Sequence, residues 1–148
     1  MALPIFKNEP LTDFTKPANR KGMEAALAKV KSMLGKEYPA VIGNEEITTP
    51  DKLKSYNPSR PTEIVGIFQK ADAAMASKAV ETAAAKFEEW RWVDPKKRVD
   101  YLIRAAKLMR KRKHEFSAVM VYEVGKTWPE ADADTAEAID FIEFYARE

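Results

Sequence analysis

The residues of this sequence that come closest to a chemical site are the carboxylates of residues 128–148. Three of them stand where a helix would begin, and the helix dipole favours negative charge there, so they need no chemical role: Glu130, Asp132 and Asp134. Glu137 lies about two turns into the predicted helix, beyond the reach of that effect. At helical spacing it shares a stripe with Asp134, Phe141 and Phe144. We therefore expect Glu137 to lie either at the rim of an interface or in a pocket.

The composition excludes most other kinds of active site within these 148 residues. No cysteine is present, which excludes a disulfide scaffold, a thiolate zinc site and a cysteine nucleophile. The single histidine, His114, allows neither a two-histidine metal site nor a histidine-dependent triad. The five glycines are never clustered, so no loop is predicted to cradle a phosphate. We predict no catalytic, cofactor-binding or metal-binding residue in the chain.

A basic stretch between residues 96 and 113 has two interpretations. It could bind nucleic acid, because phosphate contacts dominate such interfaces. It could also be the solvated flank of a helix. One stripe, roughly opposite Leu102 and Ile103, holds four basic residues: Lys97, Arg104, Lys107 and Lys111. No aromatic residue interleaves the stripe to stack on a base, and the acids of residues 128–148 offer partners within the chain. We expect the solvated flank and no nucleic-acid partner, with His114 at a helix junction.

Length and charge fit an ordinary folded protein. The chain has 148 residues, 45% of them hydrophobic, which suffices for a core, and a net charge of +2, which implies no polyanionic partner. No apolar run approaches the ~18 residues of a membrane helix. The opening residues, Met1–Lys7, lack the basic-then-apolar order of a signal peptide. We expect a soluble cytoplasmic protein without a membrane partner.

The first half of the chain is predicted to hold an arm, a helix and two strand pairs. Residues 1–15 form the arm, and a helix follows from Pro17 with Gly35 as its stop. A hairpin is expected over 38–48 around the turn pair Gly43-Asn44. A second pair joins 53–56 to 63–69 through a loop over 57–62 that its two prolines enforce.

The second half is predicted to be helical. One helix over 73–89 is capped by Asp72, another starts at Asp94-Pro95, and the helical pattern extends to Gly125. A capping box of Thr127 and Glu130 starts the last helix at about residue 128. The tryptophans are expected as packing anchors: Trp90, Trp92 and Trp128. The last helix has aromatic residues on more than one face and no terminator, so we expect the natural polypeptide to continue beyond Glu148.

Several short stretches, taken in order, resemble the N-terminal part of the aldehyde dehydrogenase superfamily. Tyr56-Asn57-Pro58 before Glu63-Ile64-Val65-Gly66 resembles the opening strand pair, and Ala83–Trp90 followed by Leu102–Ala106 resembles the next two helices. Glu123-Val124-Gly125-Lys126 matches the Glu-x-Gly-Lys turn of the superfamily. Two further stretches are similar to the branch that oxidises L-glutamate γ-semialdehyde, and with them the resemblance spans nearly the whole chain: Phe6–Pro10 and Glu123–Phe141.

The resemblance implies an α/β fold of which this chain supplies the N-terminal part, with helices that flank the NAD-binding domain. It divides the chain into an arm and helix over 1–37 and the start of the dinucleotide-binding domain over 38–148. It also implies the second step of proline degradation, in which the semialdehyde, in equilibrium with its cyclic imine, is oxidised to L-glutamate with NAD. We expect the complete enzyme to be a homo-oligomer.

The family mechanism that the resemblance implies uses a cysteine thiolate, NAD and a glutamate-activated water. In family members these groups lie further along the chain than the residues matched here, so NAD is expected to bind outside this segment. One residue is carried over from the family. Glu137 matches an acidic position that faces the α-amino or ring nitrogen of the substrate, and a partly desolvated carboxylate prefers such a cationic partner.

Two other functions stay open at this point. One is an aldehyde dehydrogenase of another substrate range, which turnover of glutamate semialdehyde against propanal would distinguish. The other is a non-enzymatic binding module that uses the basic helix of residues 96–113, which salt-dependent retention on heparin or duplex DNA would favour.

The first prediction concerns the chain by itself. Purified residues 1–148 should show no aldehyde dehydrogenase turnover and no tight NAD binding, because the sequence contains no cysteine to form the thioester. Measurable NADH production from glutamate semialdehyde by this material would contradict the prediction.

Overall fold

The computed structural model describes residues 3–148, and these divide into two compact units. One unit contains residues 3–32 together with 94–148, and the other contains residues 33–93. Among the described residues, every strand lies in the second unit. These units follow from packing within the chain, whereas the predicted boundary between residues 37 and 38 concerns the domains of a larger fold and stays a prediction.

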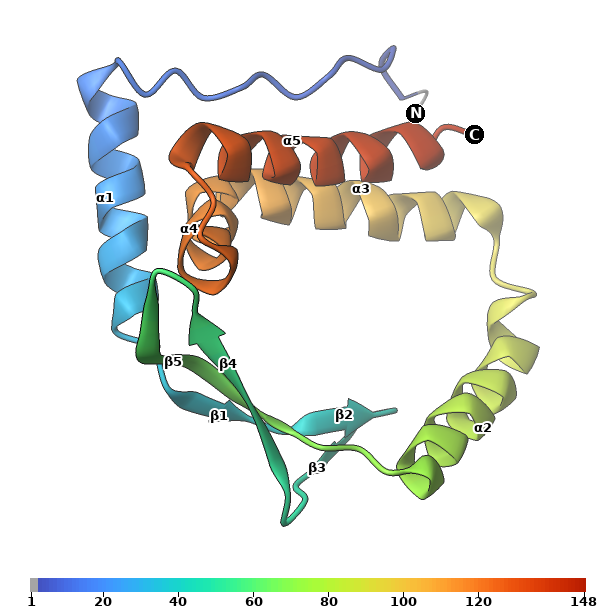
Figure 1. The fold of residues 1–148 in the computed structure, drawn as a ribbon. Coiled ribbons are helices and arrows are strands. Elements are labelled where there is room, and N and C mark those ends of the chain that lie inside the picture. Colours follow the sequence, from blue (N-terminus) through green and yellow to red (C-terminus); the bar gives the residue numbers. More distant parts are fainter. Residues whose placement is uncertain (1–2) are drawn as a thin grey trace. The chain divides into compact units, whose positions relative to one another are not determined.

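The first unit begins with the predicted arm, whose residues 3–13 are extended and run alongside α5 (Trp128–Tyr145) (Figure 1). Helix α1 (Pro17–Lys31) starts at the predicted proline and buries Met23, Ala26 and Val30. The prediction that Gly35 ends it was wrong. The helix stops at Lys31 because Ser32 caps it, with its hydroxyl donating to the Lys29 carbonyl at 2.7 Å. Gly35, at φ +75°, belongs to the following turn.

Three further helices complete the first unit: α3 (Pro95–Lys111), α4 (Lys113–Val124) and α5. The predicted starts and stops are confirmed, since the Asp94 carboxylate accepts from the Lys96 N–H at 2.9 Å and Gly125 ends α4 at φ +70°. The chain bends at Arg112, so the predicted helix junction near His114 is confirmed too. Helix α4 packs against both α1 and α5, and α3 packs against α5.

Small residues form most of the core where these helices meet. Four alanines are at most 3% exposed and let the helix backbones approach closely: Ala106, Ala118, Ala131 and Ala136. Met23 and Ile139 are the large apolar residues that are fully buried. The hydroxyls of Ser117 and Thr135 lie 3.0 Å apart and each reaches the Ala131 carbonyl oxygen, so these buried polar groups are satisfied.

The second unit is a three-stranded sheet of order β1-β5-β4, a separate hairpin β2-β3, and helix α2 (Ala73–Trp90). The predicted hairpin is confirmed as β2 (Ala40–Ile42) and β3 (Glu45–Ile47), with Gly43 at φ +63° in its turn. Strand β1 (Lys36–Tyr38) pairs in parallel with β5, a pairing between distant residues that the sequence did not predict. Asp72 caps α2 as predicted, through the Met75 N–H at 2.8 Å.

Strands β4 (Lys52–Asn57) and β5 (Arg60–Gln69) confirm the predicted antiparallel pair but correct its loop. The loop was predicted over 57–62, whereas β5 already begins at Arg60 and includes Pro61. The pairing register shifts on both sides of Tyr56, so Pro61 falls in an irregular part of the ladder. A proline, which has no N–H to donate, is tolerated in a strand at such a place.

The prediction that the tryptophans act as packing anchors was wrong for two of the three. Trp90, the last residue of α2, is 41% exposed, and Trp92, which follows the helix, is 78% exposed. Trp128 does pack, with its ring centroid 5.6 Å from that of Phe14.

Within residues 3–148, none of the helices combines the length and the apolar character that crossing a membrane requires.

The packing of the helical core predicts a graded response at Ile139, which is fully buried. The Ile139→Val variant should lose about 0.5–1.5 kcal/mol of unfolding free energy and Ile139→Ala about 2–5 kcal/mol, since the larger truncation leaves the larger cavity. Denaturant unfolding of both variants measures this order. Equal stabilities for the two variants would contradict the assigned core position.

Candidate functional site

Helix α5 provides the frame of the candidate site, and its first turn fixes where each of its side chains points. The Glu130 carboxylate accepts from the Thr127 N–H at 3.2 Å as part of the predicted capping box, which is present. It also accepts from the Thr127 hydroxyl at 2.8 Å. These bonds hold the pKa of Glu130 below its ordinary value. Residues eight apart on the helix, such as Asp132 and Asp140, then share one face.

Asp132 anchors the N-terminal arm to that face. Its carboxylate accepts from the Thr12 N–H at 2.7 Å, the Thr12 hydroxyl at 2.6 Å and the Lys113 ammonium at 2.9 Å. The Asp132 side chain is only 1% exposed. Burial by itself would raise the pKa of Asp132, but the bonds from Thr12 and the ammonium of Lys113 outweigh burial and lower it. Asp132 is therefore a buried carboxylate paired for structure.

The sequence grouped Asp132 with acids that need only the helix dipole, so its role as an anchor was missed. No spacing in the sequence indicates this role, because its partner Thr12 lies 120 residues away. Asp140 also binds the arm. Asp140 accepts from the Asn8 side-chain amide at 2.8 Å and from the Glu9 N–H at 2.6 Å. The two carboxylates together fix arm residues 8–12 along the helix.

Basic residues of α3 and α4, together with Arg147 just after α5, complete this attachment. Arg110 binds Glu9 at 2.6 Å and Glu143 at 3.3 Å, and its pKa is raised because these carboxylates outweigh its partial burial. Lys113 also donates to the Pro10 carbonyl at 2.9 Å, and Arg147 donates to the Pro4 carbonyl at 3.0 Å. The basic stretch thus pairs with acids within the chain, as the solvated-flank interpretation allowed.

Other lysines and arginines of the basic stretch face solvent as predicted: Lys97, Arg104, Lys107 and Lys111 are exposed. Arg104 lies over the Tyr101 ring at 4.8 Å, a contact typical of a helix surface.

Glu137 lies one turn before Asp140 on α5, where its exposed side chain lines a groove of about 280 Å³. The groove is lined by arm and helix residues, four of them aromatic: Phe6, Asn8, Glu137, Asp140, Phe141, Phe144 and Tyr145. Within residues 3–148 the Glu137 carboxylate has neither a hydrogen bond nor an ion pair, in contrast to Asp132 and Asp140. The structure thus brings Glu137 together with the predicted Phe141 and Phe144, whereas Asp134 pairs with Lys126.

The aromatic rings around Glu137 support one another. Phe144 contacts Phe6 edge to face with centroids 5.6 Å apart, and it contacts Tyr145 in the same way at 5.4 Å. Phe141 and Tyr145 are stacked at 6.1 Å. A carboxylate without a partner beside aromatic rings suits a cation, because both the charge and the ring faces attract it.

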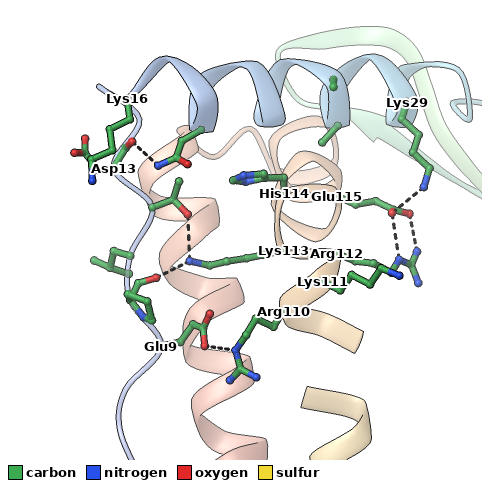
Figure 2. Close-up of a pocket in the computed structure, with 16 residues that line it drawn as sticks. Glu9, Asp13, Lys16, Lys29, Arg110, Lys111, Arg112, Lys113, His114 and Glu115 are labelled. Atoms are coloured by element: carbon green, nitrogen blue, oxygen red, sulfur yellow. Dashed lines mark hydrogen bonds and ion pairs between the residues drawn. The ribbon is translucent and has the colours of Figure 1, made fainter. Parts of the chain in front are cut away.

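A larger cavity of about 720 Å³ lies between the arm, α1 and the junction of α3 and α4 (Figure 2). Most of its charged side chains are engaged with each other. The guanidinium of Arg112 and the ammonium of Lys29 both bind Glu115, and they lower its pKa to about 2. His114 packs so close to α1 that a Cβ at Gly22 would lie 3.0 Å from its ring, which explains a glycine inside that helix. The cavity is therefore a charged packing region.

No metal centre is present in the part of the chain that the structure describes, since no three His, Cys, Asp or Glu side chains gather there.

The family comparison agrees with the sequence resemblance. The sequence model of the aldehyde dehydrogenase family matches residues 46–148. A curated relative named 1-pyrroline-5-carboxylate dehydrogenase 1, from Halalkalibacterium halodurans, is 54% identical over 97% of this chain. Another from Geobacillus, named 1-pyrroline-5-carboxylate dehydrogenase, is 55% identical over the same share. The chain spans 28% of the length of each of these relatives.

Solved structures confirm the fold class. A 1-pyrroline-5-carboxylate dehydrogenase from Thermus with bound NAD is 46% identical and superimposes with a TM-score of 0.96, over 99% of this chain and 28% of that one. A Δ-pyrroline-5-carboxylate dehydrogenase from Mycobacterium tuberculosis, 25% identical, gives a TM-score of 0.90 over the same shares.

The anchor at Asp132 predicts a pH-dependent effect of one substitution. At pH 7, Asp132→Asn should cost about 3–5 kcal/mol of unfolding free energy, because it leaves the buried Lys113 ammonium without its counter-charge. The folded-state pKa of Asp132 is lowered, so its contribution is present above the ordinary aspartate pKa and is lost as pH falls through the folded value.

Unfolding free energies of the wild type and the variant, measured from pH 7 down into the acid range, test this. The difference between them should shrink as the pH falls. A difference that stays constant to the acid limit would show that the carboxylate charge is not what binds the arm.

Proposed function

Because the chain belongs to the aldehyde dehydrogenase family, we propose that it forms the N-terminal part of an enzyme that oxidises L-glutamate γ-semialdehyde to L-glutamate with NAD. The semialdehyde is in equilibrium with its cyclic imine, 1-pyrroline-5-carboxylate. Relatives that carry the corresponding name support this proposal, at 54% and 55% identity over nearly the whole of this chain. The structural observation that carries it is the unpaired Glu137 carboxylate in an aromatic groove.

The chemistry of the substrate fits this groove. At neutral pH the semialdehyde has a positively charged α-amino group, and the cyclic imine has a ring nitrogen that can also be positively charged. Glu137 would bind that nitrogen, and the rings of Phe141 and Phe144 would attract the same charge. An ordinary aliphatic aldehyde offers no cation, so Glu137 would favour the semialdehyde over such substrates.

This chain would supply scaffold and one wall of the substrate site, while the oxidation takes place elsewhere. The sequence contains no cysteine for the covalent step. Its residues also do not fit NAD: the glycines at positive φ are isolated turn residues, namely Gly35, Gly43 and Gly125. A dinucleotide site needs glycines clustered between a strand and a helix. The nucleophile, the general base and the NAD site are therefore assigned to polypeptide outside residues 1–148.

The proposal includes a cytoplasmic homo-oligomer. Self-association is supported by the family resemblance alone.

The rival binding module loses support from the contacts of two basic residues. Arg110 and Lys113 are already paired with Glu9 and Asp132, so they are not free to hold a phosphate backbone. An aldehyde dehydrogenase of another substrate range is the alternative that the following experiment addresses.

In the full-length enzyme, Glu137→Gln should lower kcat/KM for glutamate semialdehyde about 10- to 100-fold, the worth of one charge-assisted hydrogen bond. Its kcat/KM for propanal should stay within about twofold, since propanal has no cation to lose. Steady-state NADH production on both substrates gives the two ratios.

Asp134→Asn is the matched control, because Asp134 lies one turn earlier on α5, is bound by Lys126 and does not line the groove. It should leave both kcat/KM values within about twofold. Equal losses on both substrates for Glu137→Gln, or a wild type that prefers propanal, would refute the proposed function.

A further inference from the structure

The arm forms part of the groove that contains Glu137. Phe6 and Asn8 line it together with residues of α5, and Figure 1 shows the arm running beside that helix. The arm is far from α5 in sequence, and it is kept in place by hydrogen bonds that it donates to Asp132 and Asp140. The arm thus forms the wall of the groove opposite the side chains of α5. Its extended backbone would not keep this position without those bonds.

Asp140 also determines how the Asn8 side chain is oriented. A carboxylate oxygen of Asp140 accepts from the Asn8 amide nitrogen at 2.8 Å, and the other accepts from the Glu9 N–H at 2.6 Å. A carboxylate can only accept, so it selects the NH₂ side of the amide. The Asn8 carbonyl oxygen is then left as an acceptor, and no donor within residues 3–148 reaches it.

The groove therefore contains acceptors and ring faces but no free donor cation. The Glu137 carboxylate has no partner, the Asn8 carbonyl oxygen has none, and the remaining lining is mostly aromatic. Such a set matches a group that donates several hydrogen bonds and has positive charge, as an ammonium does. A single carboxylate satisfies only part of that donor capacity, so a second acceptor adds to recognition.

We propose that Asn8 is a second recognition residue for the substrate nitrogen and that Asp140 is a positioning residue that holds the Asn8 amide for this contact. This inference rests on the proposed function, and it gives the N-terminal arm a part in substrate specificity. Its basis is the shared groove and the bond from Asn8 to Asp140.

The test uses the full-length enzyme with glutamate semialdehyde and propanal. Asn8→Ala should raise KM for glutamate semialdehyde by about tenfold, with kcat within about twofold, since one hydrogen bond to a charged group is lost. KM for propanal should not change. Lys7→Ala is the control, because Lys7 is the neighbouring arm residue, is exposed and does not line the groove. It should behave as the wild type.

Asp140→Ala tests the positioning role. It should reproduce the KM increase of Asn8→Ala, and the double variant should be no more than about twofold worse than Asn8→Ala, because the two residues act through one amide. Asn8→Ala with unchanged kinetics, or with equal losses on both substrates, would overturn the recognition role of Asn8. Fully multiplicative losses in the double variant would overturn the positioning role of Asp140.

These failures differ from failure of the proposed function. A wild-type enzyme that does not oxidise glutamate semialdehyde, or a Glu137→Gln variant without selective loss, would refute the function and the arm inference together. Selective loss at Glu137 with none at Asn8 would refute the arm inference only.

Discussion

The buried contact of Asp132 with Thr12 and Lys113 is the interaction on which the helical unit depends. A carboxylate that is 1% exposed and an ammonium that is 10% exposed have both lost their water, so each requires the other. Two hydrogen bonds from Thr12 occupy further acceptor sites of the Asp132 carboxylate, and they attach the arm to α5. Because the arm, α4 and α5 all contribute to this contact, it fixes the rotation of α5 about its own axis relative to its neighbours.

Fixing α5 in this way separates its acids by role. Asp132, Asp140 and Glu143 face the arm or the basic side chains and are paired. Glu137 lines the same groove as Asp140, beside aromatic rings, and is not paired. Helix α5 can therefore present one unpaired carboxylate to a ligand, because the arm and the basic side chains pair with its other acids. The arm performs both tasks, since it supplies partners to the structural acids and one wall to the groove.

Local chemistry made much of the fold predictable from the sequence, and distant contacts limited the rest. The caps at Asp72 and Asp94 and the turn at Gly43 depend on neighbouring residues, and all three are confirmed. The parallel pairing of β1 with β5 and the anchors at Asp132 and Asp140 join residues far apart, and no spacing indicates their partners. Glu137 was singled out by its helical stripe, but only the structure shows that its carboxylate is unpaired.

The central claim is that α5 presents Glu137 as the one free carboxylate for the substrate nitrogen. A crystal structure of the full-length enzyme with its product, L-glutamate, bound measures this most directly. The account predicts the amino nitrogen of L-glutamate within hydrogen-bond distance of the Glu137 carboxylate, at about 2.7–3.2 Å or through one water. L-Glutamate bound with its amino group held by other residues, and with Glu137 facing solvent, would contradict the account.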